Sequence, residues 1–389
     1  RLADEAFYLV GWVHFERGQF DVAVNDFRKL LDVYPSGDMA PKAMYAIGDA
    51  LYNMGDIDGS IEAYRALLQR YPAHPFAERA VLTMQETLIA ASRTDDAIRV
   101  ADDYIATNPN SSAAEELVRQ KAQIFYSGKN YSSAASELTA YLSRYPSAEK
   151  QDEALYLLGK TYLNMNDAQQ ATAAFHELKK KFPSSTLHAQ ATLDLAEYYD
   201  KSANSSMADS LYRIVQTTFA EDSAFASRAG YSRALMLRAR GDTSAAMNVF
   251  LAVADRYAGF DYAEQARYQL AMMYGKQRAV DSMKVHLSIL AGSQRSPALA
   301  AEALYRLARV DMAAKDYMKA LPQYEKIRDS YAGFEDWYTL ALLDLGECYE
   351  QINNLAEAKR TYGVLAALRP DDDYGKTAQA RLKRLERRR

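Results

Sequence analysis

The sequence predicts an all-α solenoid built from about ten stacked helical hairpins. A pattern of 37 residues recurs along the chain, and each copy contains two apolar stripes at helical spacing separated by a polar turn. The composition agrees, because 49% hydrophobic and 25% charged residues with only 10 prolines are typical of a soluble, largely helical protein. A single hairpin cannot bury its own apolar face, so the copies must stack.

Residues 153–183 show the repeat most clearly. Leu155 and Leu158 lie on the apolar stripe of a first helix, and Phe175 and Leu178 lie on that of a second helix. A polar turn separates the two helices. The repeat ends in a proline, which disfavours helical conformation in the residue before it.

The same register extends over residues 1–370, which we interpret as ten repeats. The spacing between successive ends is 37 or 38 residues throughout, which a chain without repeats would not show. The last position of each repeat falls at Pro35, Pro72, Pro109, Pro146, Pro183, Ala220, Ala258, Arg295, Ala332 and Pro370.

Three positions within the repeat keep their residue type. The first small slot, on the first helix, holds Gly11, Gly48, Ala122, Gly159, Ala196, Ala234, Ala271, Ala308 and Gly346. The second small slot, on the second helix, holds Ala23, Ser60, Ala97, Ala134, Ala171, Ala208, Ala246, Ala320 and Ala358. The large slot, four residues later, holds Phe27, Tyr64, Leu138, Phe175, Tyr212, Phe250, Leu287, Tyr324 and Tyr362. Gln85, Met283 and Ala101 are the exceptions, one in each slot. We expect the small residues to let the helices approach and the large residue to fill the remaining space.

This pattern of small, small, aromatic and proline positions resembles the tetratricopeptide repeat over residues 1–370. The resemblance implies a right-handed superhelix whose first helices line a concave groove. The period is longer than the 34 residues typical of that repeat, so we expect a longer turn between repeats. The eighth repeat matches the pattern poorly around Met283 and residues 291–297, and we expect looser packing there.

The longer period, together with the segments 153–159 and 181–185, resembles one branch of these proteins. That branch comprises bacterial cell-envelope proteins: the Tol-Pal coordinator, the lipoprotein of the outer-membrane β-barrel assembly machine, and repeat lipoproteins of secretion and gliding systems. The resemblance implies a place on the periplasmic side of the envelope, with a cytoplasmic location as the alternative. The chain begins at Arg1 without a signal-peptide pattern, so its start does not inform localisation.

After Pro370 the register changes, and residues 371–389 predict a basic capping helix. Its apolar stripe consists of Tyr374, Ala378, Leu382 and Leu385. Its basic residues are Lys376, Arg381, Lys383, Arg384, Arg387, Arg388 and Arg389. We interpret these as a solvated face, with anionic lipid or an acidic partner as the next alternative and nucleic acid as the last.

The start of the chain has no comparable polar cap. Residues 1–9 begin directly as a first helix, from which we expect further repeats or a domain upstream. A polar outer face on that helix would count against this expectation.

No motif for catalysis, a cofactor or a metal is present in the sequence. The five histidines, His14, His74, His176, His188 and His286, fall in different repeats and form no zinc-binding pair. The single cysteine, Cys348, has no partner by motif, and we expect an inert buried thiol. The net charge of −4 disfavours a nucleic-acid platform. We therefore expect a protein that is not an enzyme.

The expected groove surface is rich in tyrosine. Tyrosine lies three residues before the first small slot at Tyr8, Tyr45, Tyr156, Tyr231, Tyr268 and Tyr305. Neighbouring groove candidates are Trp12, Tyr52, Arg119, Tyr126, Lys160, Arg238 and Arg309. Tyrosine offers a large contact area and a hydroxyl for hydrogen bonding, which suits recognition of an extended peptide or a partner helix. The alternative is that these tyrosines pack between adjacent first helices. The carboxylate clamp of chaperone-binding relatives needs a Lys and Asn pair, which the slots after the small residues lack.

Three functional hypotheses remain open at this point. The first is a scaffold or adaptor that binds protein partners in a bacterial envelope or secretion assembly. The second is a cytosolic interaction module. The third is a receptor for a small ligand, which a closed pocket lined by convergent polar groups would favour over an open groove.

Overall fold

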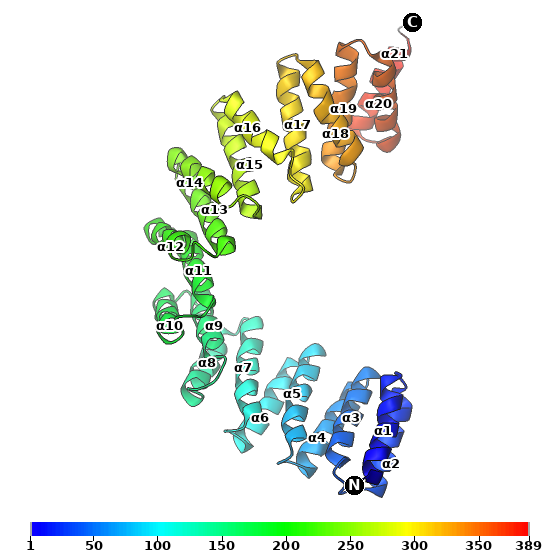
Figure 1. Cartoon of the computed structure of the whole chain (residues 1–389), viewed down its shortest axis with the longest axis vertical. Helices are drawn as coiled ribbons and strands as arrows, with labels where there is room; N and C mark the ends of the chain where they lie inside the picture. Colours follow the sequence, from blue (N-terminus) through cyan, green and yellow to red (C-terminus); the bar gives the residue numbers. More distant parts are fainter. Residues whose placement is uncertain (1, 388–389) are drawn as a thin grey trace. The chain divides into compact units, whose positions relative to one another are not determined.

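A computed structural model describes residues 2–387 of the chain, and all its regular structure there is helical. These residues form 21 α-helices, which pair in chain order into ten hairpins followed by one last helix (Figure 1). The predicted all-α fold of stacked helical hairpins is therefore confirmed. Among these residues no helix combines the length and apolarity needed to cross a lipid bilayer.

The chain forms two compact units, which are residues 1–191 and 192–389. The N-terminal unit contains α1 (Leu2–Glu16), α2 (Phe20–Val33), α3 (Ala40–Asn53), α4 (Ile57–Arg70), α5 (Pro75–Ala90), α6 (Thr94–Thr107), α7 (Ser112–Ser127), α8 (Tyr131–Arg144), α9 (Gln151–Asn164) and α10 (Ala168–Lys181). The division falls inside α11 (Leu187–Lys201).

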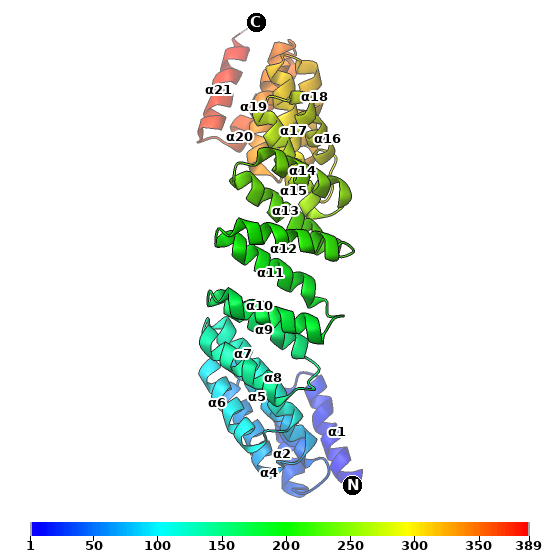
Figure 2. The same ribbon diagram turned by 90° about the vertical axis from the view of Figure 1, so that its left-hand side faces the viewer.

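The C-terminal unit continues with α12 (Ser205–Thr218), α13 (Ser223–Ala239), α14 (Thr243–Arg256), α15 (Asp261–Lys276), α16 (Val280–Leu290), α17 (Pro297–Ala313), α18 (Tyr317–Ser330), α19 (Glu335–Gln351), α20 (Leu355–Leu368) and α21 (Asp373–Glu386). Most second helices pack on both neighbouring first helices, and several first helices also contact the next first helix, namely α1 and α3, α3 and α5, α5 and α7, α13 and α15, α17 and α19, and α19 and α21. Each unit therefore has a first-helix layer and a second-helix layer (Figures 1 and 2).

The three slots form the contact between the two helices of a hairpin. A Cβ atom added to Gly11 would lie 2.6 Å from the Phe27 ring, so the aromatic ring occupies the space that the glycine leaves empty. The same relation holds between Gly346 and Tyr362, which is fully buried. Close packing of this kind tolerates little extra volume.

The turn inside each hairpin has a left-handed residue at a fixed place. Positive φ angles recur with the repeat period at Gly18, Gly55, Ser92, Lys129, Asn166, Ala203, Gly241, Arg278, Lys315 and Asn353. Only three of these are glycine, the residue that adopts this conformation without steric cost. The backbone geometry is thus conserved between repeats where the residue type is not.

Most second helices also begin in the same way. An Asp or Asn side chain at the N-cap accepts a hydrogen bond from the amide three residues later, which satisfies one of the free donors at the helix start. These caps are Asp56, Asn130, Asp167, Asn204, Asp242, Asp316 and Asn354.

The last helix, α21, packs on α20 and contacts α19 (Figure 2). Its Ala378 and Leu385 side chains are fully buried, whereas Tyr374 is exposed. Arg381 and Arg384 form ion pairs with carboxylates of α19. Two of the seven basic residues predicted here, Arg388 and Arg389, lie outside the described residues, as does Arg1 at the chain start.

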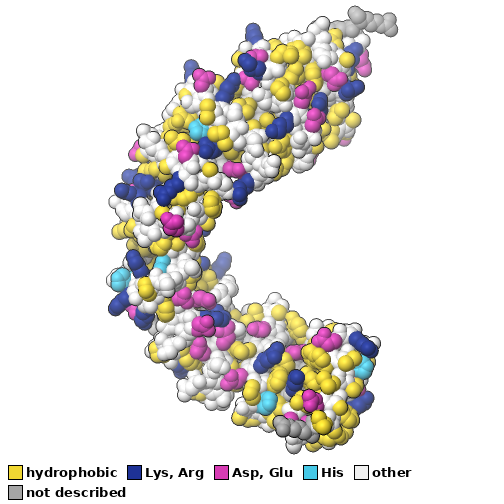
Figure 3. All heavy atoms as spheres, viewed as in Figure 1, with side chains coloured by type: hydrophobic (Ala, Val, Ile, Leu, Met, Phe, Trp, Pro, Cys, Tyr) yellow, Lys and Arg dark blue, Asp and Glu magenta, His cyan; other side chains and the backbone are white. Residues whose placement is uncertain are grey.

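The outer face of α1 is apolar and exposed. Leu2 is 84% exposed, and Leu9 and Val10 are each 53% exposed. Figure 3 shows hydrophobic side chains gathered at this end of the N-terminal unit. The polar outer face that would contradict an upstream helical segment is not observed, and the expectation of such a segment stays a prediction.

The Gly346 contact can be tested by adding one methyl group. Gly346→Ala should lower the free energy of unfolding by about 1–2 kcal/mol, because overpacking against Tyr362 outweighs the gain in helix propensity. Gly363→Ala in α20 is the matched control, since nothing lies within 4 Å of the added Cβ atom. The control should raise stability by up to about 1 kcal/mol. Urea unfolding followed by circular dichroism measures both, and equal shifts in the two variants would contradict the packing argument.

The left-handed turn residue can be tested at Lys315, which is exposed and has a φ of 62°. Lys315→Gly should raise the free energy of unfolding by about 1 kcal/mol, because glycine removes the clash between Cβ and the backbone. Lys315→Ala removes the same side chain but keeps the Cβ atom, so it should not stabilise the protein. Equilibrium unfolding of the two variants side by side is the measurement. Equal stability of the two would show that the turn is not strained.

Candidate functional site

Two recesses open on the first-helix layers, one in each unit. The first recess, of about 820 Å³, is lined by Glu86, Ile89, Ala90, Thr94, Asp95, Ile98, Arg119, Gln120, Gln123, Ile124, Phe125, Ser127, Gly128 and Asn130. The second recess, of about 810 Å³, is lined by Arg238, Gln269, Met272, Gly275, Lys276, Met283, Tyr305, Arg306, Arg309 and Val310. Both are open to solvent rather than enclosed.

Each recess lies at a repeat that departs from the slot pattern. In the third repeat the large and small residues are exchanged, because Gln85 stands in the first small slot and Ala101 in the large slot. In the eighth repeat Met283 stands in the second small slot, and α16 has only 11 residues. The next first helix packs less extensively in both places, against α6 and against α16, than other consecutive helices do within a unit. The looser packing expected around the eighth repeat is observed.

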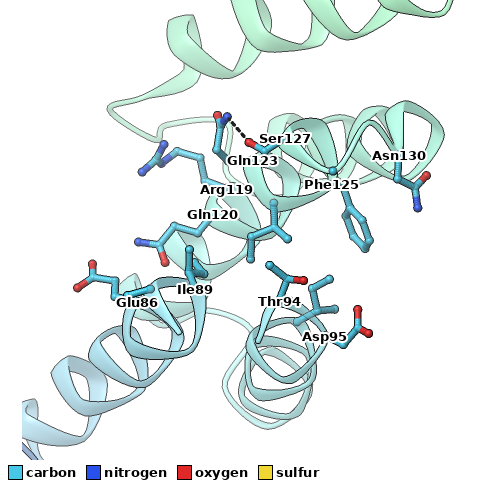
Figure 4. A pocket seen from close by; sticks show the side chains of 14 residues that line it. Glu86, Ile89, Thr94, Asp95, Arg119, Gln120, Gln123, Phe125, Ser127 and Asn130 are labelled. Atoms are coloured by element: carbon cyan, nitrogen blue, oxygen red, sulfur yellow. Dashed lines mark hydrogen bonds between the residues drawn. The ribbon is translucent and has the colours of Figure 1, made fainter. Parts of the chain in front are cut away.

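The first recess has an apolar floor and a polar rim. Figure 4 shows Ile89 of α5 among the polar side chains of α5, α6 and α7. Glu86 and Asp95 contribute two carboxylates to the rim. The one cation, Arg119, donates from Nε to Glu116 at 2.9 Å, and this hydrogen bond raises the pKa of Arg119. The free charge of the first recess is therefore negative.

Gln85 is a buried polar residue beside this recess, on α5. Its side chain is fully buried, and neither its amide nitrogen nor its amide oxygen has a hydrogen-bond partner among the described residues. A buried amide without partners destabilises a folded protein by about 1–3 kcal/mol. The large Gln85 side chain compensates in volume for the small Ala101. Its polar amide, however, lies in a buried position without a hydrogen-bond partner among the described residues.

The second recess is lined by cations. Arg309 Nη1 lies 3.1 Å from Asp344 Oδ2, and Tyr305 donates its hydroxyl to the same carboxylate at 3.1 Å. The hydrogen bond from Arg309 raises its pKa, while burial and the nearby Asp344 charge raise the pKa of Tyr305. Arg306 pairs with Glu302 at 2.6 Å. Burial lowers the pKa of Arg306, but its hydrogen bonds and charge interactions with Glu302 and Tyr268 together outweigh burial, so this pKa is raised.

Methionines form the apolar part of the second recess. A Cβ atom added to Gly275 would lie 2.9 Å from Met283 Sδ, so the absence of a side chain at Gly275 makes room for the methionine. Met272 lies on the same helix as Gly275 and also lines the recess. Methionine is flexible and polarizable, which suits a surface that adapts to a partner.

The structure brings some of the predicted groove residues together. Arg238, Tyr305 and Arg309 all line the second recess, and Arg119 lines the first. The remaining nine line neither recess. Tyr8 and Tyr45 are only 4% and 7% exposed, so they offer a partner little surface.

Several of these tyrosines join consecutive first helices. The hydroxyls of Tyr45 and Thr83 lie 2.9 Å apart, and Tyr268 donates to Glu302 at 2.7 Å. Lys160 lies over the rings of Tyr126 and Tyr156, at 5.8 and 5.4 Å from their centres. The sequence left two interpretations of these tyrosines, binding of a partner and packing between first helices. The contacts show that several of them pack between first helices.

Sequence reasoning missed Lys276 and Arg306 of the second recess. Neither occupies a slot that the repeat pattern singles out, although the exception at Met283 marked the repeat to which Lys276 belongs. Position in the repeat predicts which face a residue occupies, but not where two neighbouring repeats separate.

Three titratable residues outside the recesses, His14, His188 and Cys348, are hydrogen-bonded or buried within the fold. His14 Nδ1 lies 2.7 Å from Asp26 Oδ2, and His188 Nε2 lies 2.6 Å from the Phe182 carbonyl oxygen. Cys348 is fully buried, and burial raises the pKa of its thiol to about 12. Within residues 2–387 no group of three or more His, Cys, Asp or Glu side chains could hold a metal ion.

Comparison with known proteins identifies the repeat. Family models described as tetratricopeptide repeats match residues 8–75, 153–185 and 312–382. The chain therefore contains tetratricopeptide repeats. No curated protein matches its sequence.

Several solved structures are similar to the chain. One is a tetratricopeptide repeat protein from Parabacteroides merdae, at 14% identity over 64% of this chain and 91% of that chain, with a TM-score of 0.41. Another is the C-terminal part of a repeat protein from Cytophaga hutchinsonii, at 13% identity over 71% and 99%, with a TM-score of 0.45. A third is MamA from Desulfovibrio magneticus, at 16% identity over 47% and 97%, with a TM-score of 0.34.

The cost of the buried amide can be tested with an apolar residue of similar shape. Gln85→Met should raise the free energy of unfolding by about 1 kcal/mol or more, because it removes the unpartnered polar atoms and keeps most of the volume. Gln85→Ala should lower stability, since it leaves a cavity opposite Ala101. Chemical unfolding compares the three proteins. A Gln85→Met variant less stable than the wild type would show that the amide is satisfied by water.

Proposed function

We propose that the chain is a non-enzymatic scaffold that binds segments of a partner protein, as an extended peptide or a helix, along the first-helix layer of each unit. The observation that carries this proposal is the open recess on the layer of each unit, with an apolar floor and a charged rim. Such a combination suits polypeptide recognition, in which apolar anchors supply affinity and charges supply selectivity. Tetratricopeptide repeats are generally interaction modules rather than enzymes.

The openness of the recesses favours a protein partner over a small ligand. Sites for small molecules bury most of the ligand surface inside a concave pocket. Here the lining side chains come from three successive first helices of the C-terminal unit, α13, α15 and α17, with one methionine from α16. A surface that extends across repeats in this way suits a ligand that is itself extended.

We further propose that the scaffold acts in a bacterial cell-envelope or secretion assembly, on the periplasmic side. The support is the resemblance of the 37-residue period and of segments 153–159 and 181–185 to envelope repeat proteins. The alternative is a cytosolic interaction module. A signal sequence with a lipid-attachment cysteine in the full-length gene favours the envelope, and a gene without any export signal favours the cytosol.

The binding surface can be located by photo-crosslinking in the native cells. Benzoylphenylalanine replaces Tyr52 on α3 or Gln123 on α7, both exposed on the first-helix layer and one of them in the first recess. After irradiation both positions should give a covalent adduct with the same partner protein, because a segment that follows the layer passes both. Immunoblotting and mass spectrometry of the adducts provide the measurement.

The control is a site of similar exposure on the opposite layer. Val22 on α2 is 38% exposed, against 42% for Tyr52, so both are accessible to a crosslinking partner. Benzoylphenylalanine at Val22 should give no adduct with that protein. Adducts from Val22 alone, or the same adduct from all three positions, would refute binding along the first-helix layer.

A further inference from the structure

The second recess carries more positive charge than its surroundings neutralise. Its lining residues include four cations and no carboxylate: Arg238, Lys276, Arg306 and Arg309. Glu302 and Asp344, behind the lining, pair with Arg306 and Arg309. Arg238 and Lys276 are exposed and form no ion pair among the described residues; Arg238 donates only to the neutral amide of Gln269. Two positive charges are thus left without a counterion among residues 2–387.

The two carboxylates behind the lining, Asp344 and Glu302, already have their own hydrogen-bond donors. Asp344 already accepts hydrogen bonds from Arg309, from Tyr305 and, at 3.2 Å, from Tyr324. Glu302 accepts from both Tyr268 and Arg306. Both carboxylates are engaged by their own neighbours, so among the described residues they do not neutralise Arg238 and Lys276.

The recess also has space and an apolar surface next to these charges. The short α16 and the methionine at position 283 leave about 810 Å³ between α13, α15 and α17, which is enough for several side chains. Met272 and Met283 line this space. A ligand that combines negative charge with an apolar group would therefore satisfy both features.

We infer that the second recess binds an acidic segment of the partner polypeptide, with carboxylates on Arg238 and Lys276 and an apolar side chain between Met272 and Met283. This inference rests on the proposed function and adds the chemistry of the partner. The first recess has the opposite character, because its free charges are the carboxylates Glu86 and Asp95. An acidic segment is repelled there, so the charge pattern also selects between the two recesses.

An acidic peptide fits this site better than a nucleic acid does. Binding to a nucleic-acid backbone requires a track of cations along many phosphates, and the whole chain carries a net charge of −4. Two free cations beside a methionine-lined recess instead match a few carboxylates flanking an apolar residue.

The test uses the full chain and two short fluorescein-labelled peptides. One alternates Glu and Ser around a central Leu, and the other has Lys in place of each Glu. Fluorescence anisotropy should show binding of the Glu peptide that weakens as salt increases, because exposed charges are screened beyond a Debye length of about 8 Å at physiological ionic strength. Arg238→Gln combined with Lys276→Gln should weaken this binding by about tenfold. Replacing the central Leu with Gly should weaken it as well.

The matched control removes the same two charges elsewhere in the C-terminal unit. Arg213 and Lys201 are also exposed and form no ion pair among the described residues. Arg213→Gln combined with Lys201→Gln should leave the affinity for the Glu peptide unchanged. Circular dichroism verifies that both double variants fold as the wild type does.

Three results would overturn the inference. The first is an equal loss of affinity in the two double variants, and the second is a Lys peptide that binds through Arg238 and Lys276 as tightly as the Glu peptide. The third is that oligouridylate or phosphatidylserine vesicles bind more tightly than the Glu peptide does, and that Arg238→Gln combined with Lys276→Gln abolishes this binding. If the Glu peptide does not bind while Tyr52 still crosslinks a partner, the proposed function stands and this inference fails.

Discussion

The fold depends on one packing constraint, which is the close approach of two helices around small residues. A glycine or alanine on each helix lets the pair come together, and a large side chain fills the space between them, as Phe27 does against Gly11. The hairpin that results still exposes an apolar face, so it is stable only against another hairpin. Because each repeat contacts only its neighbours, a departure in one repeat changes the local packing and leaves distant repeats intact.

The two recesses follow from such local departures. In the third hairpin Gln85 and Ala101 exchange the small and large slots, and α7 packs less extensively against α6. In the eighth hairpin Met283 stands in a small slot and α16 is short, and α17 packs less extensively against α16. Proteins often break their own packing rules at functional sites, where a well-filled core would leave no room for a ligand. The buried, unpartnered Gln85 amide is a stability cost of that kind.

The architecture could be predicted from the sequence because the same residue types recur every 37 or 38 residues. The ten hairpins and the terminal helix follow from residue types at fixed offsets, and the structure places them accordingly. The left-handed turn residues were not predictable, since residues such as Lys315 and Arg278 give no local signal for positive φ. Burial depth was equally hidden: Tyr45 and Tyr305 have the same place in the repeat and each packs against two aromatic rings, yet Tyr45 is buried and Tyr305 is only partly buried. The recesses arise where neighbouring repeats separate, and a repeat pattern describes only what the repeats share.

The second recess combines a fixed wall with an adjustable one. On the side of α17, Tyr305 and Arg309 are held by Asp344 of the next first helix, and Arg306 is held by Glu302. Ordering these side chains in advance lowers the entropy that a partner would lose on binding. On the opposite side, Arg238 and Lys276 are exposed and without ion pairs among residues 2–387, so they can adjust to the carboxylates of a ligand. The fixed wall defines the shape of the recess, and the free cations define the charge of the segment that it accepts.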